Sequence, residues 1–291
     1  MTTNPTDALP AGLRELPPLE TRADVPAIIE FKGVTKTYSL GTKREFTAIR
    51  NVNFRVEDLQ STGEFISILG PSGCGKSTIL RLIAGLSPQF PPTEGEVLLN
   101  GAPVSGPGAD RGMVFQDYAS FDNRTVLDNV AFGLECRGMA KADRHALALD
   151  WIGKVGLNPA KDARKYPHEL SGGMRQRVAI ARTLVLKPRV ILMDEPFGAL
   201  DPVTRHNMQD LLIELWRQVQ ATVFFITHDV SEAVYLGDRV YLLSNSPGTI
   251  LHEFRVMPPD RPARLMVREK EFQEAVFYVR DILDALEEGR T

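Results

Sequence analysis

Three stretches in the first part of the chain alternate apolar and polar residues. The pattern is clearest in "AIIEFKGVTKTY" (27–38), "FTAIRNVNFRVE" (46–57) and "GEVLLNG" (95–101). A period of two residues places the apolar side chains on one face of a strand. We therefore predict antiparallel strands that form a flank of the fold, with one face exposed to water.

Three other stretches are almost continuously apolar. They are "EFISILG" (64–70), "VILMD" (190–194) and "TVFFITHD" (222–229), and each leads into a polar or glycine-containing loop. Runs of this kind are typical of parallel strands that helices cover on both faces. In such sheets, ligands bind beyond the carboxyl ends of the strands. The sequence thus predicts an α/β fold with a parallel core sheet, an antiparallel flank and a site at that edge.

Helical periodicity dominates two further regions. Residues 117 to about 187 contain the amphipathic stretches "TVLDNVAFGLECRGM" (125–139) and "ADRHALALDWIGKVG" (142–156), which predict an inserted helical subdomain. Residues 268–288 predict a C-terminal helix whose apolar face is formed by Phe272, Val276, Val279, Ile282 and Leu286. This pattern is compatible with packing on its own domain or on another subunit.

These patterns divide the 291 residues into three parts. Residues 1–26 are rich in Pro, Thr, Glu and Arg and predict a mobile tail, residues 27–260 form the main domain, and residues 261–291 form a helical extension. The first residues lack the features of a signal peptide, and the apolar runs are far shorter than the ~20 residues of a membrane span. We therefore expect a soluble, cytoplasmic protein.

Composition excludes few classes of partner. The net charge of −3 argues against a dedicated nucleic-acid binder, which usually carries a basic stripe. The chain has two cysteines, Cys74 and Cys136, which are too few for a disulfide framework. We expect Cys136 in the core.

The segment "GPSGCGKS" (70–77) fits the spacing G-x-x-x-x-G-K-[S/T] and lies between an apolar strand and a helical stretch. In this strand–loop–helix context the motif binds nucleotide phosphates. The glycines let the backbone approach the phosphates, Lys76 supplies positive charge, and the Ser77 hydroxyl is a ligand for Mg²⁺. We therefore predict a nucleotide site here.

Polar side chains also follow the other continuously apolar runs. Asp194 and Glu195 end "VILMDE", where Asp194 can reach the metal and Glu195 can orient or deprotonate an attacking water. His228 follows "TVFFIT" and is a candidate γ-phosphate contact. Gln116, after "RGMVF", has an amide that could reach the metal or the water. An ordinary structural role is the alternative for each of them.

The stretch "LSGGMRQRVAIARTL" (170–184) contains a second candidate anion site. Ser171, Gly172 and Gly173 come directly before a helical run, and N–H groups at a helix start point outward. A simple N-cap accounts for Ser171 but not for two glycines, which cost a helix about 1 kcal/mol each. Close approach of a phosphate to the backbone would account for them. The chain already has a phosphate loop, so the origin of this second phosphate is a separate question.

Taken in order, the phosphate loop, "VFQD", "LSGGMRQRVAIAR", "VILMDEPFGALD" and "ITHD" resemble the nucleotide-binding subunits of ATP-binding cassette (ABC) transporters over residues 28–250. The resemblance implies a phosphate-loop NTPase of the ABC cassette type that hydrolyses ATP with Mg²⁺. It implies that Tyr38 stacks on adenine and that Gln116 senses the metal site. Glu195 would be the general base, and His228 would be the γ-phosphate switch. The phosphates would be held by Gly70, Pro71, Ser72, Gly73, Cys74, Gly75, Lys76, Ser77 and Thr78, and the metal by Ser77, Gln116 and Asp194.

The same resemblance implies a source for the second phosphate. Two cassettes of this family pack head to tail, so Ser171, Gly172 and Gly173 would hold the γ-phosphate of the neighbour's ATP, and Asp201 would contact the opposite subunit. The neighbour would be a second copy of this chain, in a homodimer, or a related cassette, in a heterodimer. It also implies two membrane-spanning permease subunits, a solute-binding protein and a position on the cytoplasmic face of the inner membrane. The short C-terminal end and "DEPFGALD" are most similar to the nitrate, sulfonate, taurine and bicarbonate importers.

The choice of permease and of substrate stays open at this point. After Gln116 the chain reads "DYASFDNRTVLDNV" instead of the apolar stretch usual in such importers, and we expect Arg124 and its neighbours to set the pairing by charge. One alternative is a cassette of a different importer or exporter, such as one for thiamine precursors or lipids. Another is a soluble ABC ATPase that works without a transporter.

Overall fold

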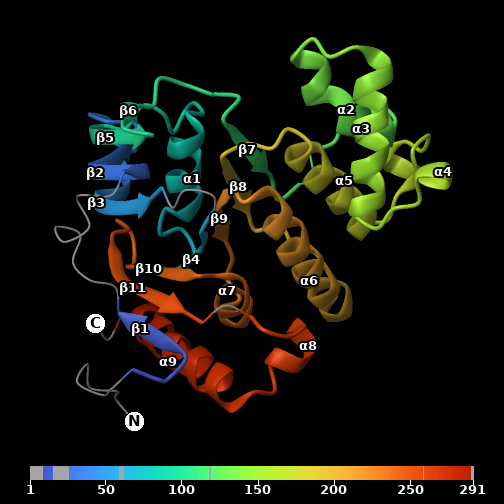
Figure 1. Ribbon diagram of the computed structural model, residues 1–291. Coiled ribbons are helices and arrows are strands. Elements are labelled where there is room, and N and C mark those ends of the chain that lie inside the picture. The colour runs from blue at the N-terminus through green and yellow to red at the C-terminus, as the bar shows by residue number, and fades with distance from the viewer. Residues whose placement is uncertain (1–8, 16–25, 59–61, 118, 258, 290–291) are drawn as a thin grey trace. The chain divides into compact units, whose positions relative to one another are not determined.

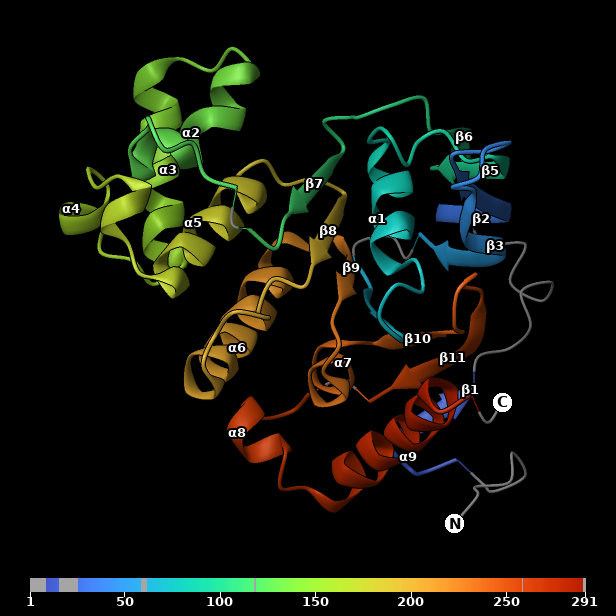
Figure 2. The same cartoon turned by 180° about the vertical axis from the view of Figure 1, so that it is seen from behind.

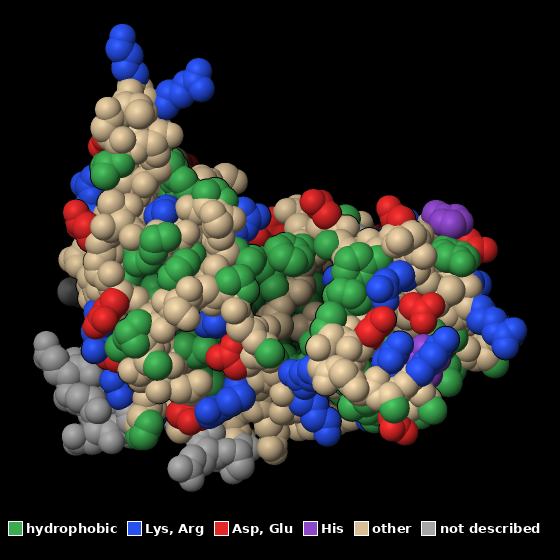
Figure 3. Space-filling model, turned by 90° about the horizontal axis from the view of Figure 1, so that it is seen from above, with side chains coloured by type: hydrophobic (Ala, Val, Ile, Leu, Met, Phe, Trp, Pro, Cys, Tyr) green, Lys and Arg blue, Asp and Glu red, His purple; other side chains and the backbone are tan. Residues whose placement is uncertain are grey.

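The computed structural model describes residues 9–15, 26–58, 62–117, 119–257 and 259–289 (Figure 1). The chain divides into two compact units. The first contains the described residues up to Gly108 and from Phe224 onward, and the second runs from Ala109 to Val223. In the described part of the chain, no helix has both the length and the apolar composition needed to cross a bilayer. Acidic and basic side chains are interspersed on the face drawn in Figure 3.

The first unit contains a four-stranded antiparallel sheet. Its strands follow the order β3 (Phe46–Glu57), β2 (Ala27–Tyr38), β5 (Glu94–Leu99) and β6 (Ala102–Pro103). The apolar positions of the alternating pattern are buried, and the rings of Phe31 and Phe54 stack with their centroids 4.4 Å apart. The predicted antiparallel strands are therefore confirmed.

A second sheet in the first unit contains the parallel strands. In order it holds β1 (Leu13–Glu15), β11 (Ile250–Val256), β10 (Arg239–Leu243), β4 (Phe65–Leu69) and β9 (Thr222–Ile226), the last with three residues in this unit. β10 and β4 are parallel, whereas β11 is antiparallel to β10. Every residue of β4, β9 and β10 is buried, as expected for continuous apolar runs. Helix α1 (Lys76–Ala84) follows β4, and α7 (Val230–Leu236) follows β9.

The chain ends with α8 (Ala263–Met266) and α9 (Lys270–Glu287), and α9 packs on its own unit. The Asn245 side chain donates to the carbonyl oxygen of Leu286 at 2.6 Å, and the ring of Tyr278 meets Phe254 of β11 edge to face. Figure 2 shows α9 beside β11 and β1. Most of the predicted apolar face is buried, but Leu283 is buried where the pattern expected Ile282. The helix therefore packs on its own domain, and a contact with another subunit stays a prediction.

Residues 13–15 differ from the expected mobile tail, because they form strand β1 in register with β11. Leu13, opposite Val256, is 3% exposed. The sequence pattern does not predict this strand, because three residues are too few to show a period of two. Residues 1–8 and 16–25 of the expected tail lie outside the described residues.

The second unit combines two parallel strands with a group of helices. β7 (Arg111–Val114) pairs with β8 (Val190–Asp194). The helices are α2 (Val126–Cys136), α3 (Lys141–Lys154), α4 (Pro159–Asp162), a 3-10 turn (Pro167–Glu169), α5 (Gly172–Leu184) and α6 (Pro202–Val219). Helices therefore occupy the range in which the amphipathic patterns predicted them. The expectation for Cys136 is wrong: it is exposed, because it lies off the buried face of α2.

Candidate functional site

The loop between β4 and α1 curls around the side chain of Lys76. The Lys76 ammonium donates to the carbonyl oxygens of Gly70 at 2.7 Å and of Pro71 at 2.9 Å, and the residue is 8% exposed. Gly70, Gly73 and Gly75 all have positive φ. The loop thus forms a small cradle with a positive charge at its base, which suits a bound polyphosphate.

Gly75 shows why the loop needs glycine at the start of α1. Its φ is 98°, and a Cβ atom would lie 2.3 Å from Cγ2 of Ile49. Gly75 is also the N-cap, so no side chain caps the helix. The first-turn N–H groups of α1 therefore face the cradle without a side-chain acceptor, as an anion site requires.

Two other predicted residues lie close to this cradle within the first unit. The hydroxyl of Tyr38, at the end of β2, is 3.1 Å from the hydroxyl of Thr78 in α1. The N–H of Thr227 donates to the carbonyl oxygen of Ile68 at 3.4 Å, which joins the end of β9 to the end of β4. His228 comes next and is exposed, in the turn that leads into α7. The adenine candidate therefore contacts the first turn of α1, and the γ-phosphate candidate follows β9, the strand beside β4.

In the second unit, the parallel pair β7 and β8 directs its polar residues to one edge. Val114 is opposite Met193, so Gln116, two residues beyond β7, and Asp194, the last residue of β8, lie at the carboxyl ends of neighbouring strands. Asp194 is 7% exposed and Gln116 is exposed. Glu195 has a φ of 46°, and such a left-handed backbone in a residue with a side chain is a mark of functional sites.

Gln176 is a site residue that the motif reasoning missed. It is fully buried in α5, and its amide donates to the carbonyl oxygen of Pro196 at 2.6 Å. Gln176, Ala179, Ile180 and Thr183 follow the spacing of a buried helical face, so periodicity could have found it. The bond links the helix that begins after Ser171 to the turn that carries Glu195.

The structure places Ser171, Gly172 and Gly173 at the start of α5. The Ser171 hydroxyl is the N-cap and accepts the N–H of Met174 at 3.3 Å. The two glycines are the first residues of the helix itself. A Cβ atom at Gly172 would meet no described atom within 4 Å, and one at Gly173 would lie 3.3 Å from Cγ2 of Thr204. The described part of the chain therefore gives no packing reason for glycine at position 172.

Asp201 has a structural role in its own chain. It caps α6 by accepting the N–H groups of Val203 at 3.1 Å and Thr204 at 3.0 Å. Hydrogen bonds from the side chain and backbone of Thr204 lower the pKa of Asp201, so it is a carboxylate at neutral pH. Its contact with an opposite subunit stays a prediction.

The positive charge of Arg124 is already engaged within the second unit. Its guanidinium donates to Glu135 at 2.7 Å and lies over the ring of Phe132, 4.8 Å from the centroid. This hydrogen bond lowers the pKa of Glu135. A role for Arg124 in choosing a permease stays a prediction, and it would have to act through this paired arrangement.

The two cysteines should differ strongly in reactivity. Cys74 is fully buried in the phosphate loop, and burial raises the pKa of its thiol although the Lys76 ammonium acts in the opposite direction. Because the thiolate is the nucleophile, we expect iodoacetamide at pH 7 to modify exposed Cys136 at least about tenfold faster than Cys74. Peptide mass spectrometry over time measures both rates in one sample. Equal rates in the folded protein would contradict this, and equal rates in denaturant are the control.

Comparisons with known proteins find several similar chains. A sequence profile described as ABC transporter matches residues 49–198. The chain is 47% identical over 260 residues to an uncharacterized ABC transporter ATP-binding protein of Methanocaldococcus jannaschii, covering 89% of this chain and 91% of that protein. It is 46% identical over 258 residues to a nitrate import ATP-binding protein of Synechocystis, covering 86% and 92%. It is 43% identical over 253 residues to a taurine import ATP-binding protein of Rhizobium johnstonii, covering 85% and 93%.

Solved structures agree with the sequence comparison. The chain is similar to a dimeric structure of a post-hydrolysis state of an ATP-binding cassette bound to ADP and phosphate, with a TM-score of 0.67 and 35% identity. The match covers 79% of this chain and 99% of that one. A second dimeric cassette structure gives a TM-score of 0.68 and 36% identity.

Proposed function

The chain belongs to the ABC transporter family and is an ATP-hydrolysing subunit of an importer, and we propose that its complex takes up a small anionic nutrient of the nitrate, sulfonate, taurine or bicarbonate class. The observation that carries the ATPase function is the glycine loop closed around the Lys76 ammonium at the start of α1. The substrate class is supported by relatives named for nitrate and taurine import, which match nearly their full length.

For each ATP, we propose the following roles for residues of the chain that binds it. Tyr38 stacks on adenine, the backbone from Gly70 to Thr78 holds the phosphates, and Lys76 neutralises their charge. Glu195 accepts a proton from the attacking water and His228 contacts the γ-phosphate. Mg²⁺, when bound with the nucleotide, would offset phosphate charge, and Ser77, Gln116 and Asp194 would hold it. The oxygen-donor side chains at these three positions are of the kind that Mg²⁺ prefers.

We propose that two cassettes complete each other's sites. Ser171, Gly172 and Gly173 of one subunit would hold the γ-phosphate of the ATP bound to the other, and Asp201 would face the opposite subunit. The vacant space beside Gly172 supports this arrangement, because only an atom from outside the described chain could require glycine there. The dimeric structures of a similar cassette, one of them with ADP and phosphate, support it further.

The importer function also requires partners in the membrane. We propose that two permease subunits, supplied with substrate by a solute-binding protein, bind a pair of these cassettes on the cytoplasmic face of the inner membrane. The alternating access of the permeases would follow the closing and opening of the cassettes, a two-state element biased by ATP.

The substrate proposal is tested on the complete transporter in proteoliposomes. We expect the solute-binding protein loaded with nitrate, taurine, another sulfonate or bicarbonate to stimulate ATP hydrolysis and uptake. The comparison solutes are a neutral sugar and a thiamine precursor. Stimulation by one of these, with no response to any anion, would overturn the proposed substrate class and leave the ATPase function intact.

Gly172→Ala tests the shared site. A methyl group at this helical position has free space, so the free energy of unfolding should stay constant or rise by up to about 1 kcal/mol. The methyl group would block close approach of the neighbour's phosphate, and roughly one charge-assisted hydrogen bond to that phosphate would be lost. We therefore expect ATP-driven dimerisation and hydrolysis to fall about ten- to hundredfold. Sedimentation with ATP and phosphate release measure the two effects.

Gly153→Ala is the matched control for this variant. Gly153 also lies in a helix, and its added Cβ atom would be 3.7 Å from Cγ of Pro159, an ordinary contact. It should leave dimerisation and hydrolysis unchanged. Wild-type hydrolysis by Gly172→Ala, or a loss of ATP affinity in the isolated subunit, would remove position 172 from the neighbour's site.

A further inference from the structure

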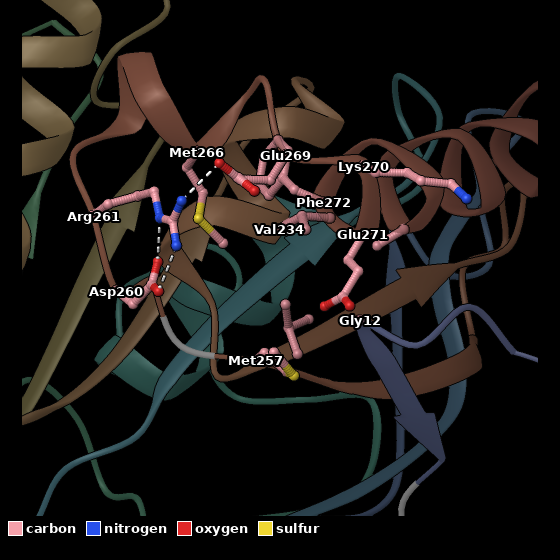
Figure 4. Close-up of a pocket in the computed structure, with 12 residues that line it drawn as sticks. Gly12, Val234, Met257, Asp260, Arg261, Met266, Glu269, Lys270, Glu271 and Phe272 are labelled. Carbon is pink, nitrogen blue, oxygen red and sulfur yellow. Dashed lines mark hydrogen bonds and ion pairs between the residues drawn. The ribbon is translucent and has the colours of Figure 1, made fainter.

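We propose that a pocket in the C-terminal part of the first unit binds a small organic cation with an apolar body. The pocket has a volume of about 390 Å³ and is lined by residues of α7, α8, α9, the end of β11 and the segment that carries Gly12 (Figure 4). All of its lining residues belong to the first unit. None of them lies within the residues that match the family profile. The proposal therefore goes beyond the ATPase function and does not rest on it.

The inner surface of the pocket is mostly apolar. It is formed by the side chains of Val234, Val256, Met257, Met266, Phe272 and Ala275. The volume and the apolar lining are typical of sites for small molecules. Two thioethers and an aromatic ring are also polarisable groups, which interact favourably with an organic cation. These features select a ligand with an apolar body.

The charged groups at the rim give the pocket a negative character. Arg261 is bound by Asp260 at 2.8 and 2.9 Å and by Glu269 at 2.6 Å, so its positive charge is already more than balanced. Figure 4 shows the carboxylate of Glu271 pointing toward the pocket, whereas Lys270 points away from it. Asp260 and Glu269 thus share one guanidinium, Glu271 adds a third carboxylate, and a cation is the complementary ligand.

The acidic residues also have a local reason to be there. Negative side chains in the first turn stabilise a helix, and Glu269 and Glu271 lie at the start of α9. This stabilisation of the helix would be the same if no pocket lay beside Glu269 and Glu271. The N–H groups of the same turn, which have no side-chain cap, would favour an anion instead. Whether the pocket prefers a cation or an anion is therefore the measurement that decides.

The methionines allow this measurement at the pocket itself. The chain has eight, of which Met257 and Met266 line the pocket, while Met193 and Met208 are fully buried elsewhere and serve as references. The full chain with labelled methionine methyl groups is titrated with benzylammonium, benzyl alcohol and benzoate, followed by NMR. We expect saturable shifts of the Met257 and Met266 signals, with benzylammonium bound at least about fivefold more tightly than benzyl alcohol and benzoate bound most weakly.

Two variants of α9 with the same change in charge complete the test. Glu271→Gln removes the carboxylate directed at the pocket and should weaken benzylammonium binding about three- to fivefold. Asp281→Asn lies on the exposed side of the same helix, outside the pocket, and should have no effect. Three results would each overturn the proposal: benzoate bound as tightly as benzylammonium, equal effects of the two variants, or no saturable shift of the two signals up to the solubility of the probe.

Discussion

Replacing Glu195 with glutamine is expected to lower the rate of ATP hydrolysis by about two to four orders of magnitude, the contribution of a positioned general base. Glutamine keeps the shape of the side chain but cannot take a proton from water at neutral pH. Glu195 lies in a turn, where it has a φ of 46° and its carbonyl oxygen accepts the N–H of Gly198 at 3.3 Å. ATP binding should survive, so the variant should accumulate as an ATP-bound dimer.

Phosphate release and sedimentation in the presence of ATP measure both effects of this substitution. Glu214→Gln is the control, because Glu214 is exposed on α6 and carries the same change in charge away from the site. It should hydrolyse ATP at the wild-type rate. If Glu195→Gln also did so, the general base would have to be another residue.

Replacing Arg239 with leucine is expected to cost about 3–5 kcal/mol of unfolding free energy, the usual effect of breaking a buried ion pair. Arg239 is 1% exposed and binds Glu64 at 3.0 Å, Glu253 at 3.1 Å and also Glu57. Leucine would leave these carboxylates without their central cation. Because a whole domain is stable by only about 5–15 kcal/mol, the loss would be large.

Chemical denaturation of the two proteins measures this difference. Arg255→Leu is the matched control: Arg255 also contacts Glu64, at 3.2 Å, but its side chain is 52% exposed. An exposed pair contributes about 0–1 kcal/mol, so this variant should change little. Similar losses of unfolding free energy in both variants would show that the contribution of Arg239 does not depend on its burial.

The Arg239 variant should also respond to pH in a defined direction. Burial raises the pKa of Glu64, and the Arg239 guanidinium opposes that shift. A group whose pKa is higher in the folded protein than in the unfolded protein stabilises the fold most at pH values below its unfolded pKa. This stabilisation is lost as the pH rises through the folded pKa. Removing the guanidinium raises the pKa further. The destabilisation of Arg239→Leu should therefore be smaller at pH 5 than at pH 8.

Patterns that repeat within a segment predicted the local structure well. The alternation over 27–38 and 46–57 gives β2 and β3 with the same bounds, and the apolar face of the last helix is nearly correct. The phosphate loop could also be predicted, because its geometry depends on neighbours in sequence. Glycine at 75 is part of the motif spacing, although the close approach of Ile49 that also requires it is a contact with a distant part of the chain.

Features that depend on distant partners could not be found in this way. The pairing of Leu13 with Val256 joins residues at opposite ends of the chain, and nothing in three residues indicates it. The carboxylates around Arg239 come from separate strands and loops, so their spacing in sequence has no pattern. The bond from Gln176 to Pro196 likewise needs the folded second unit. The motifs therefore predicted ATP hydrolysis, whereas these supporting contacts arise only in the folded chain.

Strand β1 covers part of the edge of β11. It is the last strand in the order of its sheet and covers β11, with Leu13 buried on it. Gly12 approaches α9 so closely that a Cβ atom there would lie 3.2 Å from the carbonyl oxygen of Glu271. A variant that begins at residue 27 would lack β1, and the N–H and C=O groups of β11 that pair with β1 would be unpaired. Such bare edges recruit strands from other molecules, so the shortened protein would tend to aggregate even though every nucleotide-binding motif is retained.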